Sequence, residues 1–129
     1  LGRNYSISGN VIKGKGIGNT ILGYPTANLD MSSVETIIPA NGIYATKVKL
    51  DEREFIGATS IGYNPTFNNE EKSIESFIID FNENLYGKDI EINFIKWIRA
   101  EESFDNTVEL QKQMTDDINQ IKQLFKGIN

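Results

Sequence analysis

The sequence predicts a small antiparallel β-barrel closed by one C-terminal helix. About six short apolar segments, separated by turns rich in glycine, asparagine and proline, have the alternating pattern of half-buried strands. Helical spacing of apolar residues occurs only once, near the end of the chain. This disfavours an α/β nucleotide-binding fold, in which helices alternate with strands. At 129 residues the chain is most simply one domain, residues 1–129, long enough to bury a core.

The strand-like segments alternate apolar and polar residues between turn signals. They cover residues 7–12, 26–29, 43–50, 55–63, 73–81 and a last segment that opens at 86. In that last segment Ile90, Ile92 and Phe94 share a face, and the alternation shifts at Ile95 and Trp97. A change of phase inside a strand indicates a bulge, which bends a sheet towards closure.

The helix is expected to begin at Asp105 or Asn106. Its apolar residues recur every three or four positions and form one stripe: Leu110, Met114, Ile118, Ile121 and Phe125. Asn106 followed by Glu109 resembles a capping box, in which the two residues satisfy free backbone N–H groups of the first turn.

Composition excludes several kinds of chemistry. Without His or Cys the chain has no Ser-His triad, no thiolate and no disulfide, so a general base must be a carboxylate, Lys or Tyr. The net charge of −5 argues against nucleic-acid binding, and no apolar run approaches the roughly 18 residues of a membrane span. We expect a soluble protein of a reducing compartment, the cytoplasm. Because it opens on Leu1 without a Met, the sequence is interpreted as part of a longer chain.

The stretch from Gly14 to Asn28 is the first candidate site. Its glycines, Gly14, Gly16, Gly18 and Gly23, could present several backbone N–H groups to one anion. Thr26 and Asn28 follow two residues apart and offer neutral oxygens to a hard cation. The stretch matches neither a P-loop nor a dinucleotide fingerprint. The glycines alone fit a corner loop of the barrel as well as a ligand site.

Two further candidates lie later in the chain. Glu75 alternates in step with Phe77, Ile79 and Phe81, so burial of that face would place a carboxylate among apolar groups and raise its pKa. The alternative is a solvated glutamate near the start of a strand. Arg99 and Phe104, between the last strand and the helix, could clamp and stack on a planar ligand. They could equally be a solvated arginine and a phenylalanine packed on the helix start.

Taken together, these segments resemble the riboflavin kinase family, specifically the kinase domain of bacterial bifunctional riboflavin kinase/FMN adenylyltransferases. The resemblance covers nearly the whole chain, and the Pro-Thr-Ala-Asn run at 25–28 is its most specific part. The other matching blocks include Gly23-Tyr24, Asn41-Gly42-Ile43-Tyr44, Ile61-Gly62-Tyr63-Asn64-Pro65-Thr66-Phe67, Ile74-Glu75-Ser76-Phe77 and Ile98-Arg99-Ala100-Glu101-Glu102-Ser103-Phe104-Asp105.

The resemblance implies a six-stranded antiparallel Greek-key barrel packed by one long helix. It implies transfer of the ATP γ-phosphoryl group to the 5′-hydroxyl of riboflavin, giving FMN and ADP, with Mg²⁺ and fusion to an FMN adenylyltransferase domain. Glu75 would be the general base, and Thr26 and Asn28 the metal ligands. Flavin-binding positions would be Arg99, Glu102 and Phe104. Nucleotide-binding positions would be Gly14, Gly16, Gly18, Thr20, Thr26, Ile78, Asp80 and Tyr86.

The sequence departs from the family pattern at three places. Ala100 stands where proline is usual, Phe77 where histidine is common, and Thr20 where some relatives have a basic residue. A non-catalytic flavin- or nucleotide-binding barrel is the main alternative function, although pure binding would need no base. An OB-like oligonucleotide-binding barrel has the right size but lacks a basic surface.

Overall fold

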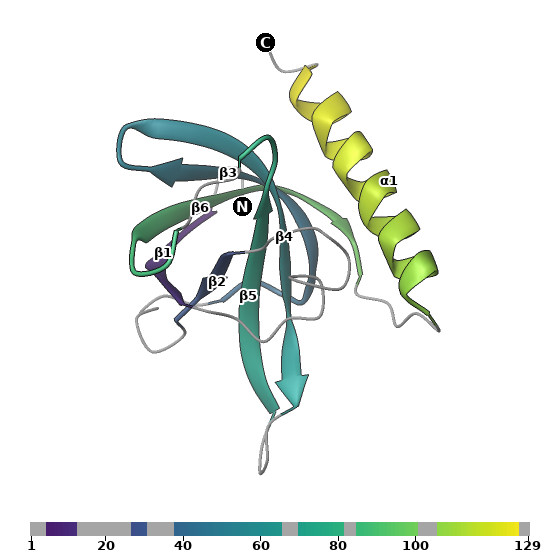
Figure 1. Cartoon of the computed structure of the whole chain (residues 1–129), viewed down its shortest axis with the longest axis horizontal. Coiled ribbons are helices and arrows are strands. Elements are labelled where there is room, and N and C mark those ends of the chain that lie inside the picture. Colours follow the sequence, from purple (N-terminus) through teal and green to yellow (C-terminus); the bar gives the residue numbers. More distant parts are fainter. Residues whose placement is uncertain are drawn as a thin grey trace.

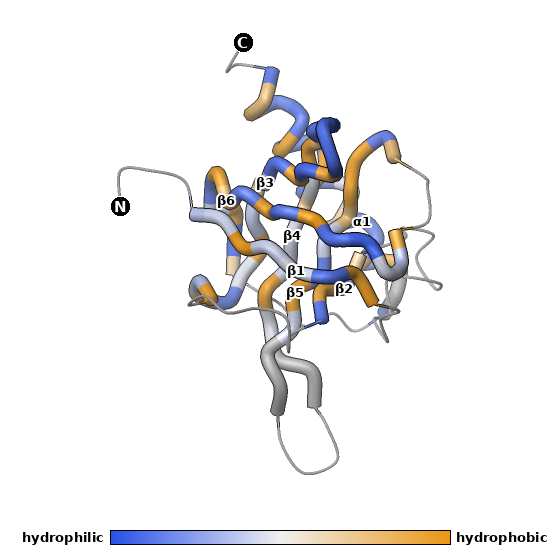
Figure 2. Tube along the Cα trace, turned by 90° about the vertical axis from the view of Figure 1, so that its left-hand side faces the viewer, coloured by the Kyte–Doolittle hydropathy of each residue, from blue (hydrophilic) through white to orange (hydrophobic). Residues whose placement is uncertain are grey.

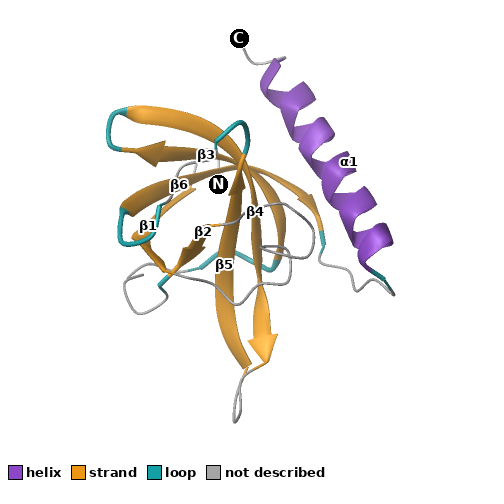
Figure 3. Cartoon of the chain, viewed as in Figure 1, coloured by secondary structure: helices purple, strands orange, loops and turns teal. Residues whose placement is uncertain are grey.

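Six antiparallel strands close into a barrel, and one helix lies against its outer side (Figures 1 and 3). The computed structural model describes residues 5–12, 27–30, 38–65, 70–81, 85–100 and 106–126. Within them the elements are β1 (Tyr5–Ile12), β2 (Ala27–Leu29), β3 (Gly42–Leu50), β4 (Arg53–Pro65), β5 (Glu70–Ile78), β6 (Asp89–Arg99) and α1 (Thr107–Lys126). The predicted barrel with a C-terminal helix is confirmed.

The strand order around the barrel is β1-β2-β5-β4-β3-β6. Strands β3, β4 and β5 follow one another as a meander, and β6 then returns to pair with β3 on one side and β1 on the other. Three consecutive strands with a fourth returning beside the first make a Greek key. Short β2 closes the barrel between β1 and β5.

The barrel interior is filled by alternate residues of every strand. Figure 2 shows the corresponding change between hydrophobic and hydrophilic positions along the strands. Fully buried aliphatic side chains include Ile7, Val48, Ile61 and Ile92. The ring of Tyr44 meets that of Phe94 edge-on, with 5.1 Å between centroids. This arrangement leaves the other face of each strand for the helix or for ligands.

Three buried hydroxyl groups cross the interior between β3 and β5. The Thr59 hydroxyl lies 2.9 Å from that of Thr46 and 2.9 Å from that of Ser76, and Thr46 also donates to the carbonyl oxygen of Gly57. All three hydroxyl side chains are fully buried. Since each hydroxyl has a hydrogen-bond partner, the barrel can bury this polar line at little cost.

The strand expected over 73–81 covers Glu70–Ile78 in the structure. The interior face of β5 carries Ile74, Ser76 and Ile78, so a serine interrupts the apolar alternation. The strand ends at Ile78, because Asp80 adopts a left-handed conformation with φ of 59°. Glu75 therefore faces outwards from the barrel, and Phe81 lies beyond the strand.

Helix α1 packs on the outer face of the sheet through its predicted apolar stripe. Ile118 and Ile121 are buried with Ala45 and Ile79, and Phe77 packs against this cluster. The backbone N–H of Glu109 donates to Asn106 Oδ1 at 2.8 Å, which confirms Asn106 as the N-cap. Among the described residues, no helix is long and apolar enough to span a membrane.

Strand β6 contains the predicted irregularity. Its pairing with β3 shifts between Ala45 and Thr46 and again between Ile43 and Tyr44, so β6 has an extra residue at each place. The second shift pairs Arg99 with Ile43 rather than continuing the preceding register. A bulge of this kind re-aims the side chains that follow it, here Arg99.

Candidate active site

One line of directly opposed residues runs across the outer face of the whole barrel. Each pair in this line is a register pair of neighbouring strands. Residues opposed in this way project from the same face, with Cβ atoms about 4.5–5.5 Å apart. We call this line the outer row; from β1 to β6 it comprises Ile12, Asn28, Glu75, Ser60, Ile43 and Arg99. Three residues predicted from separate stretches, Asn28, Glu75 and Arg99, thus share one row.

Asn28 and Glu75 are immediate neighbours in the outer row. Asn28 is only 7% exposed, and among the described residues its Nδ2 is a buried donor without a hydrogen-bond partner. A buried amide N–H without a hydrogen-bond partner is costly. The amide would be satisfied by a phosphate oxygen accepting from Nδ2 while Oδ1 binds a cation. The Asn28 side chain therefore has the groups needed to bind a metal ion and a phosphate oxygen together.

Glu75 is half-buried and lies between Asn28 on β2 and Ser60 on β4. It belongs to the face of the sheet on which α1 packs, two residues before Phe77. Arg99 is three strands further round the barrel, roughly 14 Å away along the surface at an inter-strand spacing of about 4.8 Å. A ligand lying along the row could contact both residues.

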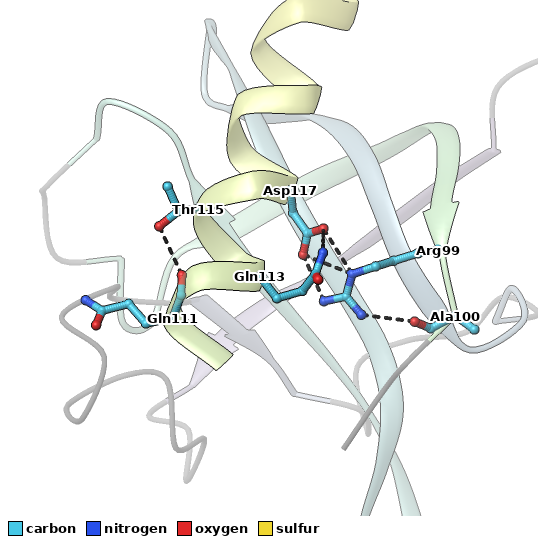
Figure 4. A network of polar contacts seen from close by, with 6 residues as sticks. All are labelled: Arg99, Ala100, Gln111, Gln113, Thr115 and Asp117. Carbon is cyan, nitrogen blue, oxygen red and sulfur yellow. Dashed lines mark hydrogen bonds and ion pairs between the residues drawn. The ribbon is translucent and has the colours of Figure 1, made fainter. Parts of the chain in front are cut away.

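At the β6 end, Arg99 is held by the helix. Its Nε and Nη2 donate to the Asp117 carboxylate at 2.8–3.1 Å, and its Nη1 donates to the carbonyl oxygen of Ala100 at 3.0 Å (Figure 4). The Arg99 side chain is 16% exposed and that of Asp117 only 4%. The candidate flavin clamp is therefore fixed in place by α1.

At the β1 end, the turn that carries Tyr86 is tied to the strand. The N–H of Gly87 donates to the carbonyl oxygen of Val11, and the N–H of Val11 donates to that of Lys88, both at 2.8 Å. Tyr86 is 47% exposed, beside the end of the row where Ile12 is 41% exposed. Tyr86 is thus placed on the Asn28 side of Glu75, away from Arg99.

The other nucleotide-binding candidates lie in different settings, or outside the described residues. Asp80 is exposed in the turn after β5. The Ile78 side chain belongs to the barrel core, so this position could contact a ligand outside the barrel only through its backbone. Gly14, Gly16, Gly18, Thr20, Thr26, Glu102 and Phe104 lie outside the described residues.

Sequence reasoning did not single out three residues that complete this arrangement. Ser60 and Ile43 lie in the outer row between Glu75 and Arg99. Asp117 is a buried carboxylate in the helix. An acidic residue beside the apolar stripe, one position before Ile118, is the signal that could have drawn attention to Asp117.

A family model described as Flavokinase: Riboflavin kinase matches residues 1–125 of the chain. The chain belongs to the riboflavin kinase family. A bifunctional riboflavin kinase/FMN adenylyltransferase of Buchnera aphidicola is 41% identical over 128 residues, which make up 97% of this chain and 40% of that protein. The chain thus spans about two fifths of the length of this relative.

Two solved structures have a similar fold. One, titled a macrolide-efflux protein from Streptococcus pneumoniae, superimposes with a TM-score of 0.83 at 32% identity, over 94% of this chain and 39% of that chain. A riboflavin kinase from Trypanosoma brucei superimposes with a TM-score of 0.64 at 18% identity, over 96% of this chain and 81% of that chain. The second likeness supports the fold alone.

Proposed function

We propose that the chain transfers the γ-phosphoryl group of ATP to the 5′-hydroxyl of riboflavin, giving FMN and ADP, with Mg²⁺ and with Glu75 as general base. Membership of the riboflavin kinase family supports the reaction class. The observation that carries the site assignment is the outer row, in which Glu75 lies between Asn28 on one side and Arg99 on the other.

Phosphoryl transfer needs chiefly in-line positioning and neutralisation of phosphate charge. In our proposal the nucleotide phosphates lie at the Asn28 end of the row, and the flavin extends towards Arg99. Glu75 would then meet the hydroxyl where the two substrates join, and would accept its proton as the new P–O bond forms. Tyr86, exposed on the Asn28 side of Glu75, would contact the nucleotide.

The metal would be held by Asn28 Oδ1 and by Thr26, together with phosphate oxygens and water. When bound, Mg²⁺ supplies charge neutralisation at the phosphates. Among the described residues, no group of three or more acidic side chains is placed to hold a metal ion. Support for Asn28 comes from its buried Nδ2, which has no hydrogen-bond partner within the described part of the chain.

We further propose that the natural protein carries an FMN adenylyltransferase domain, as the printed name of the Buchnera aphidicola relative says of that protein. A cytoplasmic location stays a prediction from the sequence.

Mixing the purified chain with ATP, Mg²⁺ and riboflavin tests the function. We expect FMN and ADP in equal amounts, and strong loss of both when Mg²⁺ is chelated. Binding of flavin without FMN formation at high protein concentration would support the non-catalytic barrel instead. Formation of ADP without FMN would contradict riboflavin as the acceptor.

A further inference from the structure

We propose that Asp117 is a positioning residue for the flavin end of the site: it holds the Arg99 guanidinium at the end of the outer row and thereby connects α1 to substrate binding. This inference rests on the proposed function. Asp117 lies on α1, outside the strands that carry the outer row.

The geometry of the contact favours positioning. Asp117 Oδ1 and Oδ2 both lie within 3.1 Å of Arg99 Nε, and Oδ2 lies 2.8 Å from Nη2. A two-point contact along one edge of the guanidinium fixes its plane as well as its position. A lysine at position 99 could form the ion pair, but it would not be fixed in orientation in this way.

The carboxylate is itself held in place from the helix. Gln113 Nε2, one turn earlier on α1, donates to Asp117 Oδ1 at 3.1 Å, as Figure 4 shows. The following residue, Ile118, is buried in the cluster that packs α1 on the sheet. The Asp117 carboxylate is therefore held by Gln113 from the helix and by Arg99 from the strand. It cannot shift unless α1 shifts on the sheet as well.

The backbone of Arg99 is confined from the opposite side. A Cβ atom at position 42 would lie 2.9 Å from the Arg99 carbonyl oxygen, so only glycine lets β3 approach β6 this closely. The Arg99 Nη1 also donates to the neighbouring Ala100 carbonyl oxygen. The side chain and the backbone of Arg99 are thus both fixed, directly before the segment that contains the flavin-binding candidates Glu102 and Phe104.

The need to attach α1 to the barrel does not by itself account for the Arg99–Asp117 ion pair. A buried ion pair adds little stability compared with apolar side chains of similar size, because both charges lose their hydration. Helix α1 already has an apolar contact surface on the barrel. An arginine at the end of the row containing Asn28 and Glu75, oriented by a buried carboxylate, is the arrangement expected of a ligand-binding group.

The test compares the Michaelis constants for riboflavin and for ATP in Asp117→Asn and in the matched control Asp116→Asn. Asp116 is the adjacent, exposed carboxylate, so both variants lose one negative charge from the same turn. We expect Asp117→Asn to raise the riboflavin KM by about 10- to 100-fold, as for loss of a charged hydrogen bond, with the ATP KM nearly unchanged. Asp116→Asn should change neither constant.

Measurements are made well below the melting temperature of each variant, so that loss of stability does not enter the comparison. If Asp117→Asn does not fold, Gln113→Ala takes its place, with a smaller rise confined to the riboflavin KM. Equal changes in both constants, or none, in a folded variant would overturn the role of Asp117 and leave the proposed function intact. If the unaltered chain forms no FMN, both the proposed function and the role of Asp117 are contradicted.

Discussion

Asn28 on β2 lies directly opposite Glu75 on β5. The first belongs to the Pro-Thr-Ala-Asn run and the second to a strand much later in the chain. The pairing brings a buried amide, whose Nδ2 has no partner among the residues the structure describes, next to a half-buried carboxylate on one face of the barrel. This adjacency is what a kinase needs, because the metal–phosphate group and the base must act on the same reacting atoms.

The proposed role of Asn28 and Thr26 as metal ligands can be tested by changing each to alanine, one at a time. Each change should raise the Mg²⁺ concentration for half-maximal activity by about tenfold or more, since a direct ligand is lost. Asn119→Ala, at an exposed position of α1, is the control. A Mg²⁺ titration identical to that of the unaltered chain would count against a ligand role for the changed residue.

Much of the fold could be predicted because local patterns match local structure. The apolar stripe of α1, its Asn106 cap and the bulge in β6 all follow from the spacing of apolar residues and from cap chemistry. The strand expected over 73–81 ends at Ile78 instead, because Asp80 adopts a left-handed conformation. Such a residue leaves the alternation of apolar side chains unchanged, so the alternation did not show where the strand ends.

The site could be predicted only in part, for a related reason. Residue types and spacing, and then the resemblance to a family, suggested Asn28, Glu75 and Arg99 individually. Their common row depends on the pairing of β2 with β5 and of β3 with β6, which no local pattern determines. The ion pair of Arg99 with Asp117 likewise joins a strand end to the middle of a helix. Neither relationship has a sequence signal of its own.

The interior hydroxyl line is expected to contribute to stability. Thr59→Val keeps the shape of the side chain but leaves the Thr46 and Ser76 hydroxyls without this shared partner. The free energy of unfolding, measured with urea, should fall by about 1–3 kcal/mol. Thr115→Val, on the exposed side of α1, should change it by less than about 0.5 kcal/mol. Equal losses of unfolding free energy in Thr59→Val and Thr115→Val would mean that the buried hydroxyl line does not stabilise the barrel.

Tyr44 predicts a pH dependence at the alkaline end. Its hydroxyl donates to the Ala40 carbonyl oxygen at 2.6 Å, and burial raises the pKa of Tyr44 above the ordinary value of 10.0. Because the folded-state pKa is the higher one, the stabilisation is fully present below pH 10.0 and is lost as the pH rises through the folded-state pKa.

Tyr44→Phe should therefore lose less stability than the unaltered chain in urea unfolding between about pH 9 and pH 11.5. A pH profile of Tyr44→Phe that runs parallel to that of the unaltered chain would contradict an effect of burial at Tyr44.

The rate of FMN formation by Glu75→Gln, at saturating Mg-ATP and riboflavin, decides whether Glu75 is the general base. Glutamine keeps the size of the side chain but cannot accept the hydroxyl proton, so the rate should fall by roughly 10²–10⁴-fold while nucleotide affinity is retained. Glu54→Gln, at an exposed position of β4, should retain full activity. A Glu75→Gln variant that forms FMN at the unaltered rate would contradict the assignment of Glu75 as the base.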